Sequence, residues 1–264
     1  MFKIAIILDM TSSNKLSLFI ITKNSAETLP ACLESVQGLA DEIIVVDSFS
    51  EDDTVKTAKQ YGAKTWQRPF TGFQDQKQFA LDQCTGDWVL SLDSDEALTP
   101  ELKEEIRKTI SKKQKHSIFL IPEMVTFLGR KMKHSGLTGK LHERLGKGTE
   151  VYFTGGLVHE RLASKGSMGR LKNYFLHTPY SSLENYFDKF NKYTTMGAKN
   201  LYDAGKKFRY FNLFRQPVDF LKFYILRLGI LDSWQGFIWA WLSSTYPTVK
   251  YIKLWFLEYK NKCK

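Results

Sequence analysis

Short apolar segments alternate with amphipathic segments through the first 110 residues, and a polar residue closes most of the apolar ones. The strand-like segments are 16–21, 42–47, 62–66 and 87–92, and the helix-like segments are 26–36, 54–61, 73–83 and 100–111. Apolar segments this short and this uniform are typical of strands that are buried on both faces. Their regular alternation with helices predicts a parallel, doubly wound α/β sheet.

The pattern changes after residue 116, where strand-like segments at 118–121 and 151–153 are separated by loops rich in glycine and lysine. A helix is predicted over 182–201. We therefore expect one α/β domain over residues 1–205 and a helical appendage over residues 206–264. The apolar run at 4–8 is too short for the core of a signal peptide, so residues 1–15 are expected to form an extra strand or an arm.

Three of the predicted strands end in polar side chains, and ligands gather at the carboxyl ends of strands in sheets of this kind. Asp93 and Asp95 follow the last of these strands. Two carboxylates this close repel each other unless a cation or hydrogen-bond donors compensate, and their oxygens suit Mg²⁺ or Mn²⁺. The alternative interpretation is a solvated acidic turn before a helix.

Further polar candidates lie at or near the same edge. Asp47 ends a strand and could accept hydrogen bonds from a base or a ribose, or it could form an Asx turn. Gln76 and Lys77 lie on a predicted helix. They could contact a nucleotide and its phosphates, or they could belong to an exposed polar face.

The order and spacing of these motifs resemble family 2 glycosyltransferases, and in particular the bacterial lipopolysaccharide-core branch of the inner-core β-glucosyltransferase type. The matching segments are Ile20 to Asn24, Asp41 to Ser48, Gly72 to Ala80, and Gly86 to Glu96. The resemblance implies a GT-A fold, a UDP-sugar donor, a divalent metal ion and an inverting mechanism.

The resemblance also implies roles for individual residues. It places Thr22, Asn24 and Asp47 near the nucleotide, with Gln76 and Lys77 nearby. It places Asp93 and Asp95 where ribose, metal ion and diphosphate meet. One departure is Phe49, where the family commonly has glycine, and this puts the shape of that turn in doubt.

The pair Arg144-Leu145 and the segment from Gly155 to Glu160 resemble the acceptor side of the family's site. Inversion needs a base that takes the proton of the acceptor hydroxyl, and Glu160 is the candidate, with His159 orienting it or contacting phosphate. The alternative is that this His-Glu pair is structural. A second pair, His142 and Glu143, lacks the helical spacing of a zinc site.

The formal net charge of +10 is concentrated in the tail: residues 206–264 hold eleven Lys or Arg, three Asp or Glu, and four of the six tryptophans. Such a composition favours helices that lie on an anionic membrane surface. The alternative is a helical pair that caps the catalytic domain. Nucleic-acid binding is not expected, because no known nucleic-acid-binding module accompanies the positive charge.

The three cysteines form no CxxC pair and are odd in number, which favours a reducing compartment over a disulfide framework.

Together these observations predict an enzyme that transfers a hexose, with glucose as the first candidate, to an inner-core heptose at the cytoplasmic face of the inner membrane. A glycosyltransferase of another cell-envelope polysaccharide is the first alternative. An aspartyl phosphohydrolase is disfavoured because Ala97 stands where that class has Thr or Val. A non-catalytic membrane scaffold would not need polar groups at three strand ends.

Overall fold

The computed structural model describes residues 14–155 and 160–262, so the expected arm over residues 1–15 lies almost wholly outside the described residues. The chain divides into two compact units. The first unit consists of Met1–Ile121 and His142–Tyr174, and the second of Pro122–Leu141 and Phe175–Lys264. The domain boundary after residue 205 stays a prediction; the helix that precedes it belongs to the same unit as the tail.

The first unit is built on a parallel sheet in the order β3-β2-β1-β4, as the alternating pattern predicts. An antiparallel strand, β8, continues the sheet beside β4, and the first residues of β6 follow it. The strands of this unit are β1 (Leu16–Thr22), β2 (Glu42–Asp47), β3 (Lys64–Gln67), β4 (Trp88–Ser91), β5 (Glu96–Leu98), β6 (Ile118–Phe127), β8 (Leu141–Lys147), β9 (Val151–Thr154), β10 (Arg161–Ser164) and β11 (Met168–Arg170).

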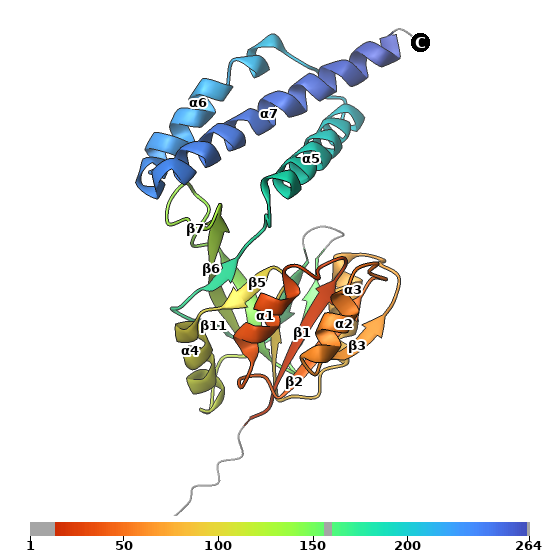
Figure 1. Ribbon diagram of the computed structural model, residues 1–264, viewed down its shortest axis with the longest axis vertical. Coiled ribbons are helices and arrows are strands. Elements are labelled where there is room, and N and C mark those ends of the chain that lie inside the picture. The colour runs from red at the N-terminus through yellow and green to blue at the C-terminus, as the bar shows by residue number, and fades with distance from the viewer. Residues whose placement is uncertain (1–13, 156–159, 263–264) are drawn as a thin grey trace, which may run out of the picture. The chain divides into compact units, whose positions relative to one another are not determined.

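Four helices cover this sheet: α1 (Leu29–Val36), α2 (Thr54–Gln60), α3 (Phe73–Asp82) and α4 (Pro100–Ile110). Helix α3 packs on β1 and β2, where its Ala80 joins a buried cluster with Phe19 and Ile44. Helix α1 contacts α2 and α4, and Figure 1 shows it in front of the strands. Both faces of the parallel strands are therefore buried, which explains their uninterrupted apolar sequences.

Local sequence determines where two of these helices begin. Thr99 caps α4 by accepting a hydrogen bond from the Leu102 backbone N–H at 3.2 Å, and Pro100 takes the first turn, as predicted. Helix α1 starts at Leu29 rather than at residue 26, because Pro30 fixes the first helical turn there.

The second unit contains the end of β6, two short strands and all the C-terminal helices. Its elements are β7 (Arg130–Lys131), β12 (Phe175–His177), α5 (Leu183–Asp203), η1 (Tyr210–Leu213), α6 (Gln216–Leu221), the π turn η2 (Lys222–Leu226), η3 (Gly229–Asp232) and α7 (Ser233–Lys262). Both α5 and α6 pack against the long α7. The predicted helical tail is confirmed.

Within the second unit, aromatic rings join the end of β6 to the helices. The ring of Phe127 lies 5.2 Å from that of Trp239 and 6.1 Å from that of Tyr186. The buried carboxylate of Asp232 accepts hydrogen bonds from the backbone N–H groups of Lys133 and His134 at 3.0 and 2.9 Å. These contacts hold the loop after β7 against the start of α7.

Candidate functional site

The carboxyl ends of β1, β2 and β4 lie at one edge of the parallel sheet. Thr22 at the end of β1 is in register with Asp47 at the end of β2, and Phe19 of β1 is in register with Ser91 of β4. The polar residues that follow these three strands are therefore neighbours in space, which the sequence pattern predicted only from chain order.

Asp47 is fully buried and its carboxylate organises the loop that follows β2. It accepts hydrogen bonds from the Thr22 hydroxyl at 3.0 Å, from the Ser50 backbone N–H at 2.8 Å and from the Gln67 side-chain amide at 3.3 Å. The bond from Ser50 closes a tight turn of the kind Asp commonly forms. The carboxylate thus holds the turn in place, and its contact with a nucleotide stays a prediction.

Asn24 connects the loop after β1 to the loop after β2. Its backbone N–H donates to the Ser50 hydroxyl at 2.7 Å, and its side-chain carbonyl accepts from the Glu51 backbone N–H at 2.9 Å. Asn24 has a φ of 49°, a left-handed conformation that Asn tolerates better than most residues. The two loops are fixed to each other and form one wall of the site.

Phe49 has a φ of 59°, so the turn keeps the left-handed backbone conformation that favours glycine. Its ring is 51% exposed. Phe49 therefore adopts a backbone conformation that favours glycine, the residue that the family commonly has here.

Gln76 and Lys77 are buried, not part of an exposed helix face. The side-chain amide of Gln76 donates to the Ser48 hydroxyl at 3.1 Å, and its Oε1 atom accepts no hydrogen bond from the described residues. A buried acceptor without a partner is uncommon and is often a site for a ligand donor. The Oε1 atom of Gln76 can accept an N–H or O–H group, and its contact with a nucleotide stays a prediction.

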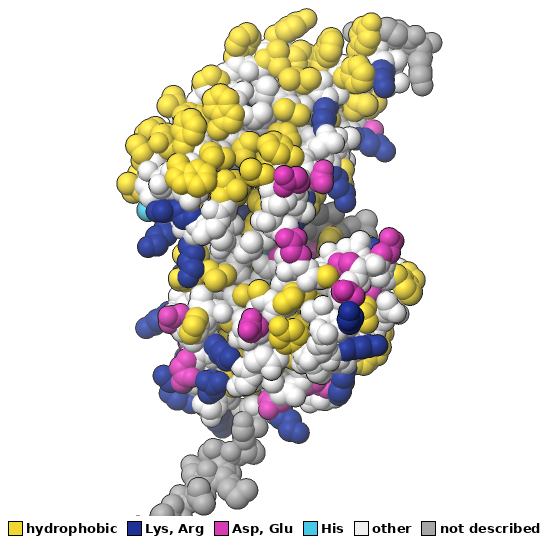
Figure 2. Space-filling model, in the orientation of Figure 1, with side chains coloured by type: hydrophobic (Ala, Val, Ile, Leu, Met, Phe, Trp, Pro, Cys, Tyr) yellow, Lys and Arg dark blue, Asp and Glu magenta, His cyan; other side chains and the backbone are white. Residues whose placement is uncertain are grey.

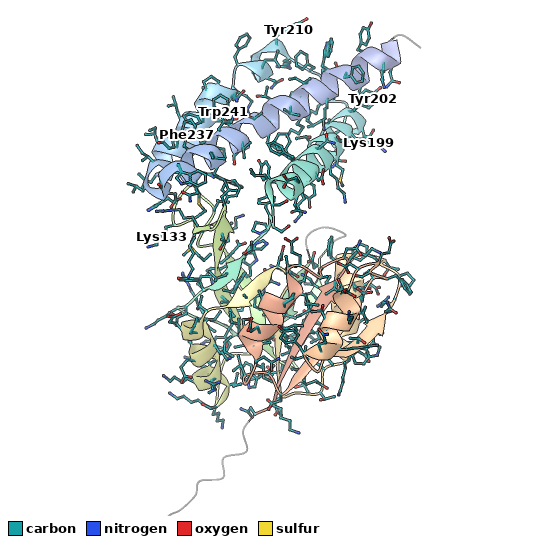
Figure 3. All side chains as sticks on the ribbon, viewed as in Figure 1. Lys133, Lys199, Tyr202, Tyr210, Phe237 and Trp241 are labelled. Atoms are coloured by element: carbon teal, nitrogen blue, oxygen red, sulfur yellow. The ribbon has the colours of Figure 1, made fainter. Side chains whose placement is uncertain are left out.

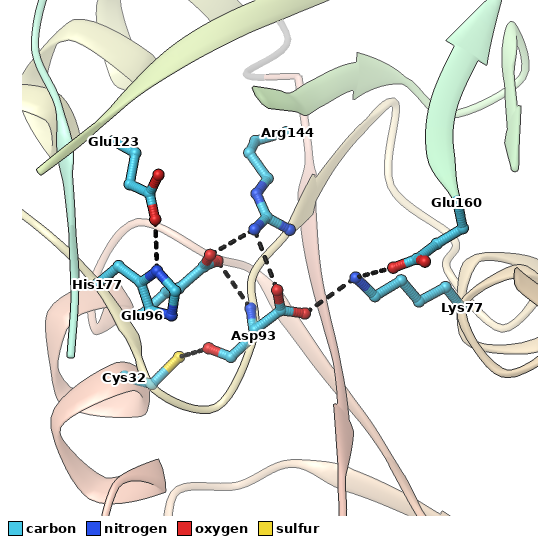
Figure 4. A network of polar contacts seen from close by, with 8 residues as sticks. All are labelled: Cys32, Lys77, Asp93, Glu96, Glu123, Arg144, Glu160 and His177. Atoms are coloured by element: carbon cyan, nitrogen blue, oxygen red, sulfur yellow. Dashed lines mark hydrogen bonds and ion pairs between the residues drawn. The ribbon is translucent and has the colours of Figure 1, made fainter. Parts of the chain in front are cut away.

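The ammonium of Lys77 joins two carboxylates that are distant in the sequence. Its Nζ lies 3.0 Å from a carboxylate oxygen of Asp93 and 3.0 Å from one of Glu160, and its side chain is only 9% exposed. Figure 4 shows the lysine between the two acids. The candidate diphosphate corner and the candidate base are thus brought together around one cation.

A second cation, Arg144, balances the other side of Asp93. Its guanidinium lies 3.1 Å from the second carboxylate oxygen of Asp93 and forms a short ion pair with the buried Glu96. Glu96 also accepts a hydrogen bond from the Asp93 backbone N–H at 2.9 Å. Burial acts to raise the pKa of Asp93, but the charges of Arg144 and Lys77 outweigh it and hold that pKa well below its ordinary value.

The buried thiol of Cys32 lies beneath this corner, 3.6 Å from the backbone oxygen of Asp93. Burial, followed by the charges of Glu96, Asp93 and Asp95, raises the pKa of the Cys32 thiol. All three carboxylates are therefore within electrostatic range of one atom. The thiol stays protonated and is part of the core, as expected for a cysteine that is not a catalyst.

Asp93 and Asp95 form the candidate metal site. In the described part of the chain, no cluster of three or more His, Cys, Asp or Glu side chains is arranged to hold a metal ion. Mg²⁺ and Mn²⁺ commonly take only one or two carboxylates and complete their shells with water and phosphate oxygens. Both carboxylate oxygens of Asp93 are ion-paired, with Lys77 and Arg144, and the binding of a metal ion by Asp93 and Asp95 stays a prediction.

The structure describes one residue of the predicted His-Glu pair. His159 lies outside the described residues, whereas Glu160 is described and contacts Lys77.

The Glu96–Arg144 ion pair was not predicted from the sequence, although a charged residue before the buried Leu145 of β8 was a signal. The antiparallel register of Leu145 with Leu90 of β4 brings Arg144 to the corner.

Comparison with known proteins agrees with this geometry. Residues 17–163 match the model of the family described as Glycosyl transferase family 2. The chain is 32% identical over 236 residues to an uncharacterized glycosyltransferase of Rickettsia typhi, covering 85% of this chain and 81% of that protein. It is 30% identical over 246 residues to the lipopolysaccharide core biosynthesis glycosyltransferase LpsC of Rhizobium meliloti, covering 87% and 90%.

Among solved structures, TarS 1–349 of S. aureus is similar, with a TM-score of 0.49 and 18% identity over 94% of this chain and 92% of that one. The parallel sheet, the polar strand ends and the family match together identify the fold as GT-A with C-terminal helices. The chain belongs to glycosyl transferase family 2 and is a glycosyltransferase.

Proposed function

We propose that this glycosyltransferase is inverting and moves a hexose, glucose in the first instance, from a UDP-sugar to a heptose of the lipopolysaccharide inner core. The observation that carries the proposal is the position of Lys77, 3.0 Å from both Asp93 and Glu160. Asp93, proposed to lie at the donor diphosphate, and Glu160, the proposed base, contact the same ammonium group. Both would therefore act at the anomeric carbon of the donor sugar.

On the donor side, the loops after β1 and β2 would hold the nucleotide through Thr22, Asn24 and Asp47. The buried Gln76 Oε1, which lacks a partner among the described residues, suits a nucleotide N–H or O–H donor. Asp93 and Asp95 would hold Mg²⁺ or Mn²⁺, which when bound neutralises charge on the diphosphate. Lys77 and Arg144 add fixed positive charge at the same place.

On the acceptor side, Glu160 would take the proton of the acceptor hydroxyl. A bond then forms between that oxygen and the anomeric carbon, and the bond from the anomeric carbon to the diphosphate oxygen breaks. The electron pair leaves with the diphosphate, and the configuration at the anomeric carbon inverts. His159 precedes Glu160 and is proposed to orient it or to contact phosphate.

Two observations support a lipid-linked acceptor: the description of one relative and the composition of the tail. LpsC is described as a lipopolysaccharide core biosynthesis glycosyltransferase, and its similarity covers 87% of this chain. A lipid-linked acceptor would be met at the cytoplasmic face of the inner membrane, to which the protein would attach peripherally. The basic, aromatic tail is consistent with that attachment.

The test is a donor screen. Purified protein is mixed with UDP-glucose, UDP-galactose or UDP-N-acetylglucosamine, a divalent metal ion and a truncated core lipid, and the products are analysed by mass spectrometry and NMR. We expect one hexose to be added with inversion, and Glu160→Gln to lower the rate at least about 100-fold. Glu101→Gln, an exposed control on α4, should retain the wild-type rate. Transfer with retention, or an unchanged rate for Glu160→Gln, would refute the mechanism.

A further inference from the structure

Exposed hydrophobic side chains are concentrated in the tail of the second unit. Among the described residues, 26 large hydrophobic side chains are exposed, and 17 of these lie from Tyr210 onward. Figure 2 shows them gathered over α6 and α7. Single exposed apolar residues are ordinary, whereas a continuous patch marks a surface that binds something.

Four exposed apolar residues recur at helical spacing from the end of η1 through α6 and η2. Phe214, Val218, Leu221 and Ile225 recur at intervals of four, three and four residues, and they are 76%, 67%, 56% and 47% exposed. An amphipathic helix of a globular protein normally turns such a stripe toward the core. Here the stripe faces outward.

The inward side of the same segment is already filled by aromatic contacts with α7. The ring of Phe220 lies 5.5 Å from that of Phe237, and the ring of Tyr224 lies 5.7 Å from it. The contacts of this segment with α7 are therefore made by other side chains than those of the outward stripe. The outward stripe is a second apolar surface on the same segment.

Helix α7 adds aromatic residues to this surface. Trp234, Phe237 and Trp241 are exposed at intervals of three and four residues, and Figure 3 shows Phe237 and Trp241 on α7. We name the apolar tail face as the set Phe214, Val218, Leu221, Ile225, Trp234 and Trp241. Tryptophan is enriched at the headgroup depth of membranes.

The tail carries a net positive charge, with eleven Lys or Arg against three Asp or Glu, and its acids are held by contacts within the protein. Asp219 pairs with Arg215 at 2.8 Å, the buried Asp232 accepts backbone N–H bonds, and Glu258 accepts from the Phe208 backbone N–H at 3.1 Å. In contrast, Lys206, Lys207 and Lys222 are exposed. An anionic surface is the complementary partner.

No helix in the described part of the chain combines the length and apolar character needed to cross a membrane. Exposed apolar residues at helical spacing, together with exposed lysines in the same tail, are instead the pattern of helices that lie in the plane of the interface.

We propose that the apolar tail face inserts into the headgroup layer of an anionic phospholipid bilayer, with Lys206, Lys207 and Lys222 contacting lipid phosphates. This inference deepens the proposed function and rests on it in one respect, the lipid-linked acceptor. The bilayer is the occupant that accounts for both the apolar tail face and the exposed lysines of the tail.

Flotation with lipid vesicles tests the proposal. The full chain should float with vesicles of phosphatidylethanolamine and phosphatidylglycerol and bind poorly to phosphatidylcholine. Phe214→Ser/Leu221→Ser should lower binding more than about tenfold, because two apolar side chains are lost from the interface. The matched control is Tyr152→Ser/Met168→Ser, two exposed apolar residues of the first unit, and it should bind as the wild type does.

The charge contribution is tested separately with Lys206→Gln/Lys207→Gln/Lys222→Gln. We expect this variant to lose at least about tenfold in binding to the anionic vesicles and to show a weaker dependence on salt. Circular dichroism checks that the variants remain folded. Equal binding of the wild type and the Phe214→Ser/Leu221→Ser variant would overturn the proposal.

Depth is measured by quenching of Trp234 fluorescence with brominated lipids. Bromines near the headgroups should quench more than bromines at the chain ends, and Trp234→Phe should remove part of that signal. A chain that dimerises through the apolar tail face and binds no vesicles would make a second copy the occupant and refute the bilayer. Transfer to a soluble, deacylated core oligosaccharide tests the proposed function independently of flotation.

Discussion

The ammonium of Lys77 lies 3.0 Å from a carboxylate oxygen of Glu160, although the two residues belong to different parts of the sequence. The same ammonium is 3.0 Å from Asp93. Because the lysine is buried, its removal would leave two carboxylates near each other without their shared counter-ion.

Lys77→Met is therefore expected to lower the free energy of unfolding by about 3 kcal/mol and transfer activity by at least about 100-fold. Urea unfolding and initial rates measure the two effects. Lys108→Met, on the exposed side of α4, is the control and should change stability by less than about 0.5 kcal/mol. If Lys77→Met were as stable and as active as the wild type, the bridge would have no energetic role.

The ionisation of Glu42 should make the free energy of unfolding depend on pH in the acidic range. Burial acts to raise its pKa, but Lys64, Ser17 and Thr85 hold the carboxylate by ion pairing and hydrogen bonds and lower its pKa to about 2. A carboxyl group with a lowered folded-state pKa stabilises the fold above its unfolded pKa, and that stability is lost as the pH falls through the folded value.

We therefore expect Glu42→Gln to be less stable than the wild type at pH 7, and the difference to shrink between pH about 4.5 and 2. Urea midpoints at several pH values measure this, with Glu101→Gln on the exposed side of α4 as the control. A difference that stays constant over the whole range would show that the carboxylate charge is not the cause.

The local features of the fold could be predicted because each depends on residues that are adjacent in the sequence. The apolar run that ends at Asp47 identifies a buried strand, and Thr99 before Pro100 identifies a helix start. The neighbourhood of Asn24, Asp47 and Asp93 followed from topology alone, because parallel strands place their carboxyl ends at one edge.

Features that depend on register or on backbone partners could not be predicted. Arg144 and Glu96 are 48 residues apart and meet through the antiparallel pairing of β8 with β4, which no periodicity specifies. Asp232 is the only charged residue between Arg227 and Lys250, and it accepts hydrogen bonds from the backbone N–H groups of Lys133 and His134 and from the Ser135 hydroxyl. Backbone donors have no side-chain signature, so sequence could not reveal this contact.

Nucleotide binding should depend on a divalent metal ion through Asp93 and Asp95. Calorimetry of UDP with Mn²⁺ or Mg²⁺ should show binding that EDTA weakens by at least about tenfold, since the ion links the aspartates to the diphosphate. Asp95→Asn should reduce the effect of the metal, whereas Asp53→Asn, an exposed control, should not. Equally tight UDP binding in EDTA would argue for Lys77 and Arg144 as the charges that hold the diphosphate.

Phe49 should carry a conformational cost that glycine would relieve. A non-glycine residue in the left-handed region costs about 1–2 kcal/mol, and the greater entropy of unfolded glycine offsets about 0.5–1 kcal/mol of that gain. Phe49→Gly is therefore expected to be more stable than Phe49→Ala by roughly 0.5–1 kcal/mol in urea unfolding. Alanine is the matched control because it removes the exposed ring but keeps the Cβ atom that causes the strain. If the two variants were equally stable, the left-handed turn would be held without strain, and the substitution of glycine by phenylalanine in this loop would need another explanation.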